Sequence, residues 1–206
     1  LQWQQVNFIP GMQGLVTELN WFNGNGRLNL KGKAGHLAID NLLPDNIEYQ
    51  RFAADLYVQS TDLGFSLAMH NAQLKSEVIN FYPEAFYRST DQHFSFSSHI
   101  DSTDIRNLPE LYPTELMGKG TRDYLINSLQ RGQVTSGQIL WHGAFNEFPF
   151  EQQQGVFQAQ VQIEDGTLKF APQWPALTEL SINLLFENQS LHMQSQKGLL
   201  LDVRLD

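Results

Sequence analysis

The sequence has no cysteine and few charged side chains, and each shortage excludes a class of protein. Without cysteine, the 206 residues can form neither a disulfide scaffold nor a thiolate metal site. Charged residues make up 17% of the chain, and 22 acidic residues against 13 basic ones give a net charge of -9. Nucleic-acid binding depends on basic side chains that neutralise phosphates, so nucleic acid is not an expected partner.

Long apolar runs are missing as well. No stretch is long and apolar enough to cross a membrane as a helix, and the first residues lack the charged-then-apolar order of a signal peptide. The chain begins at Leu1 rather than at a methionine and stops at Asp206, inside an expected strand. We therefore interpret it as a segment of a longer protein and expect any membrane anchor or export signal to lie outside it.

Sequence motifs for catalysis are weak. The best nucleophile constellation is in Ser98–Asp101, but neighbouring strand residues point to opposite faces, and no serine is flanked by glycines as in a nucleophile elbow. The six histidines show no metal-binding spacing. Asp101, Asp104, Glu110 and Glu147 are ordinary loop acids unless the fold brings two of them together. We expect no catalytic residue, no metal and no cofactor.

An internal repeat is the most informative feature that is present. Phe8–Asp40 resembles Phe170–Asp202, with identical residues at matching positions, such as Leu19 and Leu180. Repeated units bury their apolar faces against their neighbours, so this pattern favours an array of stacked units.

Alternating apolar and polar residues predict β-strands along most of the chain. In Phe157–Ile163 the apolar residues interleave with glutamines, and the same period of two appears at 52–59, 65–70 and 138–145. Turn sequences between such segments lie at 23–26, 44–46, 62–64, 165–166 and 187–188. We expect a mainly β fold, an antiparallel meander forming a curved sheet with one apolar face.

One short helix is expected near residues 121–131. Thr121 can cap its start and Gly132 can end it. Its apolar face would consist of Tyr124, Leu125, Ile126 and Leu129. Two interpretations stay open: the helix covers one end of the sheet, or it forms a plug or gate across an apolar groove.

A sheet with one apolar face must cover that face with a second sheet, by closing on itself, or with an apolar ligand. An open, curled sheet forms a trough suited to hydrocarbon chains, whereas a sandwich hides the same residues, and the pattern leaves both open. For a trough, we predict a lining of Leu19, Trp21, Leu28, Leu30, Phe157, Val161, Ile163, Leu180, Ile182, Leu184 and Phe186.

Short aromatic, glycine and proline motifs follow one another in the second half of the chain. They comprise Trp141, His142, Gly143, Phe148, Pro149, Gly155, Trp174 and Pro175. In order and spacing they closely resemble the YhdP family, large AsmA-like proteins of the Gram-negative envelope. The resemblance covers about residues 104–206 and extends more loosely, through the repeat, to Phe8–Asp40. We expect these residues to have structural roles, the two glycines allowing bulges or close strand approach and the two prolines ending strands.

The resemblance implies a periplasmic β-groove segment of a protein that is anchored in the inner membrane and reaches toward the outer membrane. It implies phospholipid transport between the membranes, with acyl chains sliding along an apolar groove and head groups in water. The implied partners are phospholipid acyl chains and, through other parts of the protein, membranes. Residues 1–103 would end one groove repeat, and residues 104–206 would supply a short helix and the start of the next repeat, within one continuous unit.

Other interpretations belong to different classes of protein. A β-sandwich scaffold or binding module of the envelope would use its glutamine- and asparagine-rich faces to bind a protein or glycan, and an envelope hydrolase is a third candidate. An isolated groove segment is also open to self-association through its exposed strand edges.

Overall fold

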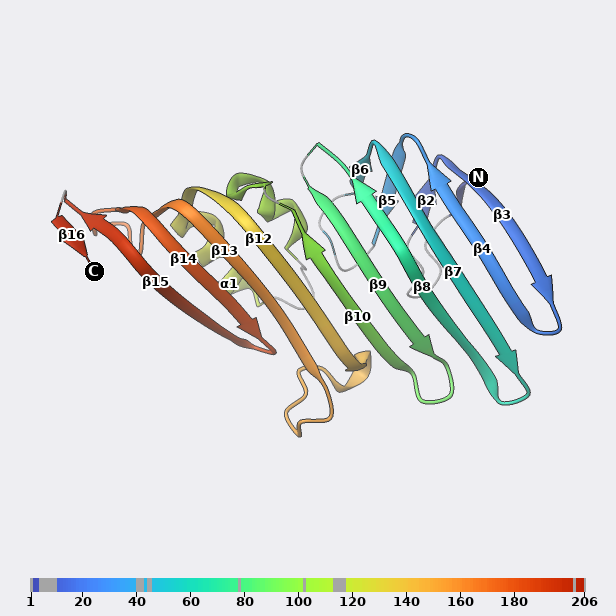
Figure 1. Cartoon of the computed structure of the whole chain (residues 1–206). Coiled ribbons are helices and arrows are strands. Elements are labelled where there is room, and N and C mark those ends of the chain that lie inside the picture. Colours follow the sequence, from blue (N-terminus) through green and yellow to red (C-terminus); the bar gives the residue numbers. More distant parts are fainter. Residues whose placement is uncertain are drawn as a thin grey trace.

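The computed structural model describes residues 2–3, 11–39, 43, 46–77, 79–101, 103–112, 118–201 and 203–205. Its main element is a twisted antiparallel sheet of twelve strands, which follow one another across the sheet almost in chain order (Figure 1). Its strands are β3 (Leu15–Phe22), β4 (Asn25–Gly32), β7 (Arg51–Thr61), β8 (Gly64–Lys75), β9 (Asn80–Arg88), β10 (His93–Ile100), β11 (Thr103–Asp104), β12 (Leu129–Ala144), β13 (Val156–Leu168), β14 (Leu177–Glu187), β15 (Ser190–Leu200) and β16 (Val203–Leu205). The expected antiparallel meander with one short helix is confirmed.

A second, smaller sheet lies on one side of the large one, behind β4 and β7 in Figure 1. Its four strands are β1 (Gln2–Trp3), β2 (Gly11–Gln13), β5 (Gly35–Ala38) and β6 (Ile47–Tyr49). The Tyr49 hydroxyl donates a hydrogen bond to the backbone carbonyl of Gln13 and so ties β6 to β2. Such short strands are too brief to show an alternating pattern, and the sequence did not predict this sheet.

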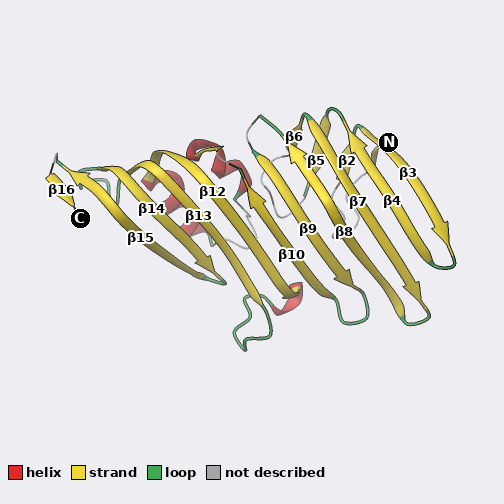
Figure 2. Ribbon diagram, viewed as in Figure 1, coloured by secondary structure: helices red, strands yellow, loops and turns green. Residues whose placement is uncertain are grey.

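Three helical segments complete the fold: the 3₁₀ helices η1 (Ile105–Leu111) and η2 (Phe145–Glu147), and α1 (Lys119–Ser128). Figure 2 shows η1 and α1 behind the upper part of the large sheet, on the same side as the small sheet. None of the helices in the described ranges is long and apolar enough to cross a membrane.

The helix differs at both ends from the sequence-based expectation. It starts after Gly118, and Thr121 does not cap it. It ends at Ser128 because Leu129 already has an extended backbone and pairs with Leu168 as the first residue of β12. Gly132 therefore does not end the helix but lies inside β12, with φ of 151° in a stretch of shifted register.

Three of the five expected turns are confirmed, at Asn23, Asp62 and Asn188. The turn expected at 165–166 is wrong, because β13 runs on to Leu168. Asp165 has φ of 52° there, and the register with β14 shifts, so the turn-forming pair produces an irregularity within the strand and no chain reversal. Residues 44 and 45 of the remaining turn lie outside the described residues.

The repeated segments form matching hairpins at opposite edges of the large sheet. β3 and β4 are joined by a two-residue turn at 23–24, and β14 and β15 by one at 188–189. Between them the sheet is continuous, because β10 and β12 pair along the whole of β10, across the boundary expected near residue 103. The division into one groove repeat ending at 103 and another beginning at 104 stays a prediction.

Candidate functional site

One row of apolar side chains crosses the large sheet at right angles to its strands. Residues paired directly across neighbouring strands point to the same face, so the registers define the row. From β3 to β13 it consists of Leu19, Leu28, Leu56, Met69, Ala85, Phe96, Trp141 and Phe157. Every member is apolar, and all lie on one face.

Much of this face is open to solvent. We call its half-buried and exposed apolar residues the apolar band. The band consists of Leu19, Trp21, Leu28, Leu56, Val58, Phe65, Leu67, Met69, Phe81, Ala85, Tyr87, Phe94, Phe96, Ile100, Ile139, Phe157, Ala159, Val161, Phe186, Leu191 and Met193. It spans the ten strands from β3 to β15, which at about 4.8 Å per strand gives a length of about 40 Å.

The same face is covered at the strand ends that lie opposite the hairpin turns. On one half, Met12 and Tyr49 of the small sheet bury Leu15, Phe52 and Leu74. On the other half, the segment from η1 to α1 forms a second buried cluster with the sheet, comprising Ile105, Leu108, Leu125, Leu129, Val134, Ile163, Leu168, Leu180, Ile182 and Leu184. The apolar band therefore has one covered edge and one edge at the hairpins.

The helical cover has a small cavity of its own. Between η1 and α1 a space of about 380 Å³ is lined by Ile105, Tyr112 and Leu125 and by the polar side chains of Arg106 and Asn127. Burial raises the pKa of Tyr112 to about 12. The helix covers the sheet, as one of the two interpretations expected, because Leu125 is buried among sheet residues. Its role as a gate stays a prediction.

The predicted lining residues fall into two groups. Those in the apolar band are Leu19, Trp21, Leu28, Phe157, Val161 and Phe186, of which Leu19 is 62% exposed. Those under a cover are Leu30, beneath the small sheet, and Ile163, Leu180, Ile182 and Leu184, in the cluster with η1 and α1. The covered residues are 2% exposed or less.

The Trp-His-Gly motif belongs to an aromatic cluster at the hairpin end of β12. Trp141 is 4% exposed and donates a hydrogen bond from Nε1 to the carbonyl oxygen of Gly143 at 3.0 Å. Its ring packs on Phe148, 5.4 Å away between centroids, and on Phe150, 5.2 Å away. Trp141 thus packs inside the fold, and His142 points to the opposite face.

The two motif glycines make room for Phe150. A Cβ on Gly143 would lie 2.7 Å from the Phe150 ring, and a Cβ on Gly155 would lie 2.5 Å from it. Gly143 also has φ of 136°, which side chains rarely allow. Pro149 follows Phe148 in the same loop, beyond the end of β12. The glycines therefore allow the close approach that the sequence predicted.

The Trp-Pro motif lies apart from this cluster. Trp174 is 60% exposed and touches Phe170, whose ring centroid lies 6.2 Å away. Pro175 is also exposed and precedes β14, so it stands before a strand and does not end one.

The opposite face of the large sheet is mainly polar. Asp55 accepts hydrogen bonds from Asn71 at 3.0 Å and Asn29 at 2.7 Å, and Arg27 lies 3.5 Å away. Hydrogen bonding by Asn71, followed by that of Asn29, lowers the pKa of Asp55. This network is satisfied internally and accounts for the one carboxylate buried in the described sheet.

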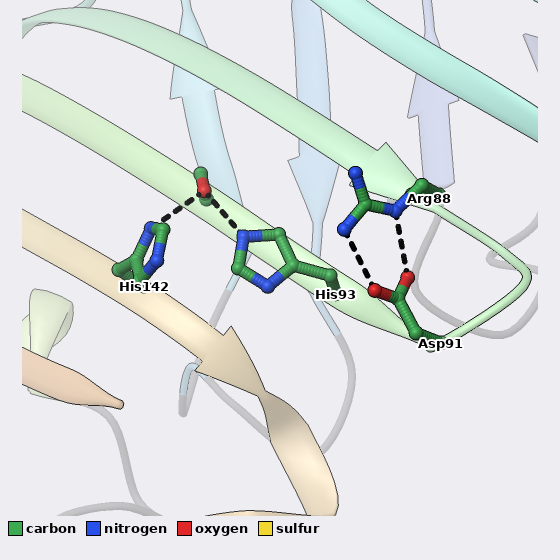
Figure 3. Close-up of polar contacts among 5 residues, drawn as sticks. Arg88, Asp91, His93 and His142 are labelled. Carbon is green, nitrogen blue, oxygen red and sulfur yellow. Dashed lines mark hydrogen bonds and ion pairs between the residues drawn. The ribbon is translucent and has the colours of Figure 1, made fainter. Parts of the chain in front are cut away.

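Two histidines that the sequence spacing did not connect meet on the polar face. The Ser95 hydroxyl lies 3.0 Å from both Nε2 of His93 and Nδ1 of His142, and the two rings are 4.5 Å apart between centroids (Figure 3). In the neighbouring hairpin, Arg88 forms an ion pair with Asp91, which lowers the pKa of Asp91 to about 2. No group of three or more potential metal ligands occurs among the described residues.

The catalytic constellations considered in the sequence are not assembled. The Ser98 hydroxyl donates to the backbone carbonyl of His99, whose ring stacks on Tyr82 at 4.3 Å. Asp101 accepts a hydrogen bond from Tyr82 at 2.8 Å. Asp104 is paired with Arg106, and Glu147 is exposed in η2; the side chain of Glu110 lies outside the described set.

The fold and its surface define a class of protein: a large open antiparallel β-sheet with one apolar face that is only partly covered. Comparison with known sequences goes further. The profile of the YhdP protein family matches residues 1–206, and the chain belongs to the YhdP family.

A curated relative supports the same assignment. The chain is 25% identical over 198 residues to the intermembrane phospholipid transporter YhdP of Escherichia coli (strain K12). The match covers 95% of this chain and 16% of the relative, which is named as a transporter and not as an enzyme. No solved structure matches the chain.

Proposed function

We propose that this chain conducts phospholipid along the apolar band as part of an intermembrane transport path. The observation that carries the proposal is the row from Leu19 to Phe157, in which eight paired positions on successive strands are all apolar. The relative from E. coli is named a phospholipid transporter, and the band is a surface on which acyl chains can lie without interruption.

The energetics favour this use of the band. Each methylene removed from water is worth about 0.8 kcal/mol, so a two-chain lipid crossing water unaided faces a large barrier. An apolar surface about 40 Å long lets the chains move from strand to strand while they stay in contact with apolar side chains. This lowers the barrier without a catalytic group. The source of direction lies elsewhere in the protein.

The proposed contacts follow from exposure. The lipid-contacting residues are those of the band, among them Leu19, Trp21, Leu28, Phe157, Val161 and Phe186 from the sequence-based lining. Leu30, Ile163, Leu180, Ile182 and Leu184 instead hold the covers in place. The sequence-based lining did not include the central residues Leu56, Met69 and Ile139. The alternation in their strands nevertheless indicates that they lie on the apolar face.

The proposal includes a location and partners. A phospholipid path between two membranes places this chain in the periplasm, within a protein anchored in the inner membrane, and its partners are acyl chains and, through other parts of the protein, the membranes. The rival β-sandwich is not favoured, because the small sheet covers only one end of the apolar face.

Lipid content of the purified protein tests this function. The full-length protein, extracted from the inner membrane in mild detergent, is expected to carry phospholipid in native mass spectrometry. Leu19→Asp should reduce the bound lipid because it places a charge in the band, where Leu19 is exposed. Val16→Asp is the matched control, since Val16 is on the same strand, 75% exposed, and on the other face. Equal lipid content in both variants would argue against the band as the lipid site.

A further inference from the structure

Aromatic side chains gather along one edge of the apolar band. On seven strands the apolar-face side chain closest to the hairpin is aromatic. Six of these residues are exposed or half-buried, and we call them the aromatic rim: Trp21 of β3, Phe65 of β8, Tyr87 of β9, Phe94 of β10, Phe157 of β13 and Phe186 of β14. The seventh, Trp141 of β12, is buried in the aromatic cluster. The aromatic rim follows the hairpin ends of the strands, at the bottom of the sheet in Figure 1.

The other edge of the band is aliphatic and covered. One step in from the aromatic rim, β4, β7 and β8 present Leu28, Leu56 and Met69, and further along the same strands Leu30 and Leu74 are buried beneath the small sheet. The second half of the sheet repeats this order, from Phe157 through Val161 to Ile163 beneath the helical cover. Across its width, the band therefore changes from aromatic and open to aliphatic and closed.

Packing within the sheet does not explain the two most exposed rings of the aromatic rim. Trp21 is 55% exposed, although its ring lies so close to Gly26 that a Cβ there would be 2.4 Å from it. Phe65 is also exposed, with one aromatic neighbour, Tyr87, at 5.9 Å. An exposed aromatic ring leaves much of its apolar surface in water, so stabilising a core does not explain its presence here.

Exposed aromatic rings suit the boundary between hydrocarbon and water. Trp and Tyr, present in the rim as Trp21 and Tyr87, combine an apolar body with a polar tip, and they concentrate where the acyl region of a membrane meets the head groups. The phenylalanines of the rim supply apolar surface between them. Beyond the aromatic rim, the hairpins carry polar residues such as Asn23, Asp62 and Gln92. The polarity across the band thus matches that of a phospholipid, from head group to chain end.

We propose that phospholipid lies across the band in one orientation, with its glycerol and head group at the aromatic rim and its acyl chains directed toward the covered edge. This inference rests on the proposed function. The hairpins at 22–25, 61–64, 88–93 and 187–190 and the loop at 145–155 contain one basic residue, Arg88, which Asp91 neutralises. The head group is therefore held in water and not in a phosphate pocket, and the chains are the part that the protein recognises.

Two photoreactive phospholipids test the orientation. One carries a diazirine in the head group, and the other carries a diazirine at the end of an acyl chain. Each probe is added to the full-length protein and irradiated, and the labelled peptides are identified by mass spectrometry. The head-group probe is expected to label peptides of the aromatic rim, around Trp21, Phe65 and Tyr87. The chain-end probe is expected to label peptides near the covered edge, around Phe52 and Val161.

The outcomes separate this inference from the proposed function. Reversed labelling, or the same distribution for both probes, overturns the fixed orientation while leaving the band as a lipid site. Labelling of neither edge by either probe overturns both proposals. The expected separation of the two probes supports both.

A pair of matched variants shows whether the aromatic rim sets the orientation. Tyr87→Leu combined with Phe94→Leu keeps the rim apolar but removes two rings, and it should reduce the separation of the probes several-fold. The separation is measured as the ratio of labelling at the two edges, so that a change in total lipid capture cancels. Tyr57→Leu combined with Phe86→Leu likewise replaces one tyrosine and one phenylalanine, but on the polar face of the sheet. This control should leave the separation unchanged. A loss of separation in both pairs, or in neither, would contradict a role for the aromatic rim.

Discussion

Val161 on β13 lies directly opposite Leu184 on β14, on the same face of the sheet, but only Leu184 is buried. Leu184 is 2% exposed within the cluster beneath the helical cover, whereas Val161 packs against the edge of that cluster and belongs to the apolar band. The boundary between the covered and the open part of the apolar face passes between these two side chains.

This boundary predicts unequal costs of substitution. Leu184→Ala should lower the free energy of unfolding by about 2–5 kcal/mol because it leaves a cavity, and Val161→Ala should lower it by about 1 kcal/mol. With aspartate, Leu184→Asp should abolish cooperative unfolding, whereas Val161→Asp should keep it and lose bound lipid. Urea denaturation followed by circular dichroism measures these differences. Similar losses for the two alanine variants would show that the band is closed at Val161.

Gly143 provides a second prediction, on the aromatic cluster. Gly143→Ala should destabilise the protein because the new Cβ meets the Phe150 ring at 2.7 Å and the backbone φ of 136° disfavours a side chain. The near-ultraviolet circular dichroism should also weaken, because Phe150 must move from its place against Trp141. Gly120→Ala is the control, since a Cβ there has no neighbour within 4 Å and alanine favours the helix. A Gly143→Ala protein as stable as the parent would contradict the packing described.

The sequence predicted which side of each strand is apolar, but it did not predict which apolar side chains are buried. Alternation in Phe157–Ile163 identifies the apolar side because side chains on a strand point to opposite faces in turn. It does not tell Leu28 from Leu30, which share a face of β4. Leu30 is buried by the small sheet and Leu28 remains open, and that difference arises from segments distant in the sequence.

Sequence signals for turns and helix ends failed where hydrogen bonding between neighbouring strands determined the structure instead. Asp165 and Gly166 form a turn sequence, but pairing with both neighbours carries β13 through them, and the left-handed conformation of Asp165 accommodates the shift in register. In the same way, pairing of Leu129 with Leu168 ends α1 before Gly132. The two glycines of the aromatic cluster were predicted to allow a close approach, and they leave room for the Phe150 ring.

Asp104 gives the stability a defined dependence on pH. Its side chain accepts hydrogen bonds from the side chain and the backbone N–H of Arg106 at the start of η1, and these bonds lower the pKa of Asp104 to about 2. A carboxyl group with a pKa below its ordinary value of 3.8 stabilises the fold above that value and loses the contribution as the pH falls toward 2. Asp104→Asn should flatten the fall in stability between about pH 4 and pH 2. Urea denaturation across that range tests this, and unchanged curves would contradict it.

Neighbouring residues on β12 allow a test of continuous conduction. Ile139 lies at the centre of the apolar band, and Leu140, the next residue, points to the polar face, where it is 40% exposed. If lipid moves along the band from strand to strand, one charge at its centre blocks the path, so Ile139→Asp should stop the arrival of newly labelled phospholipid at its destination membrane. Leu140→Asp should leave arrival unchanged at equal protein levels. The two variants have the same mass and charge and differ by one position in the chain. Equal behaviour would therefore mean that conduction does not depend on the face, and the band would not be the path.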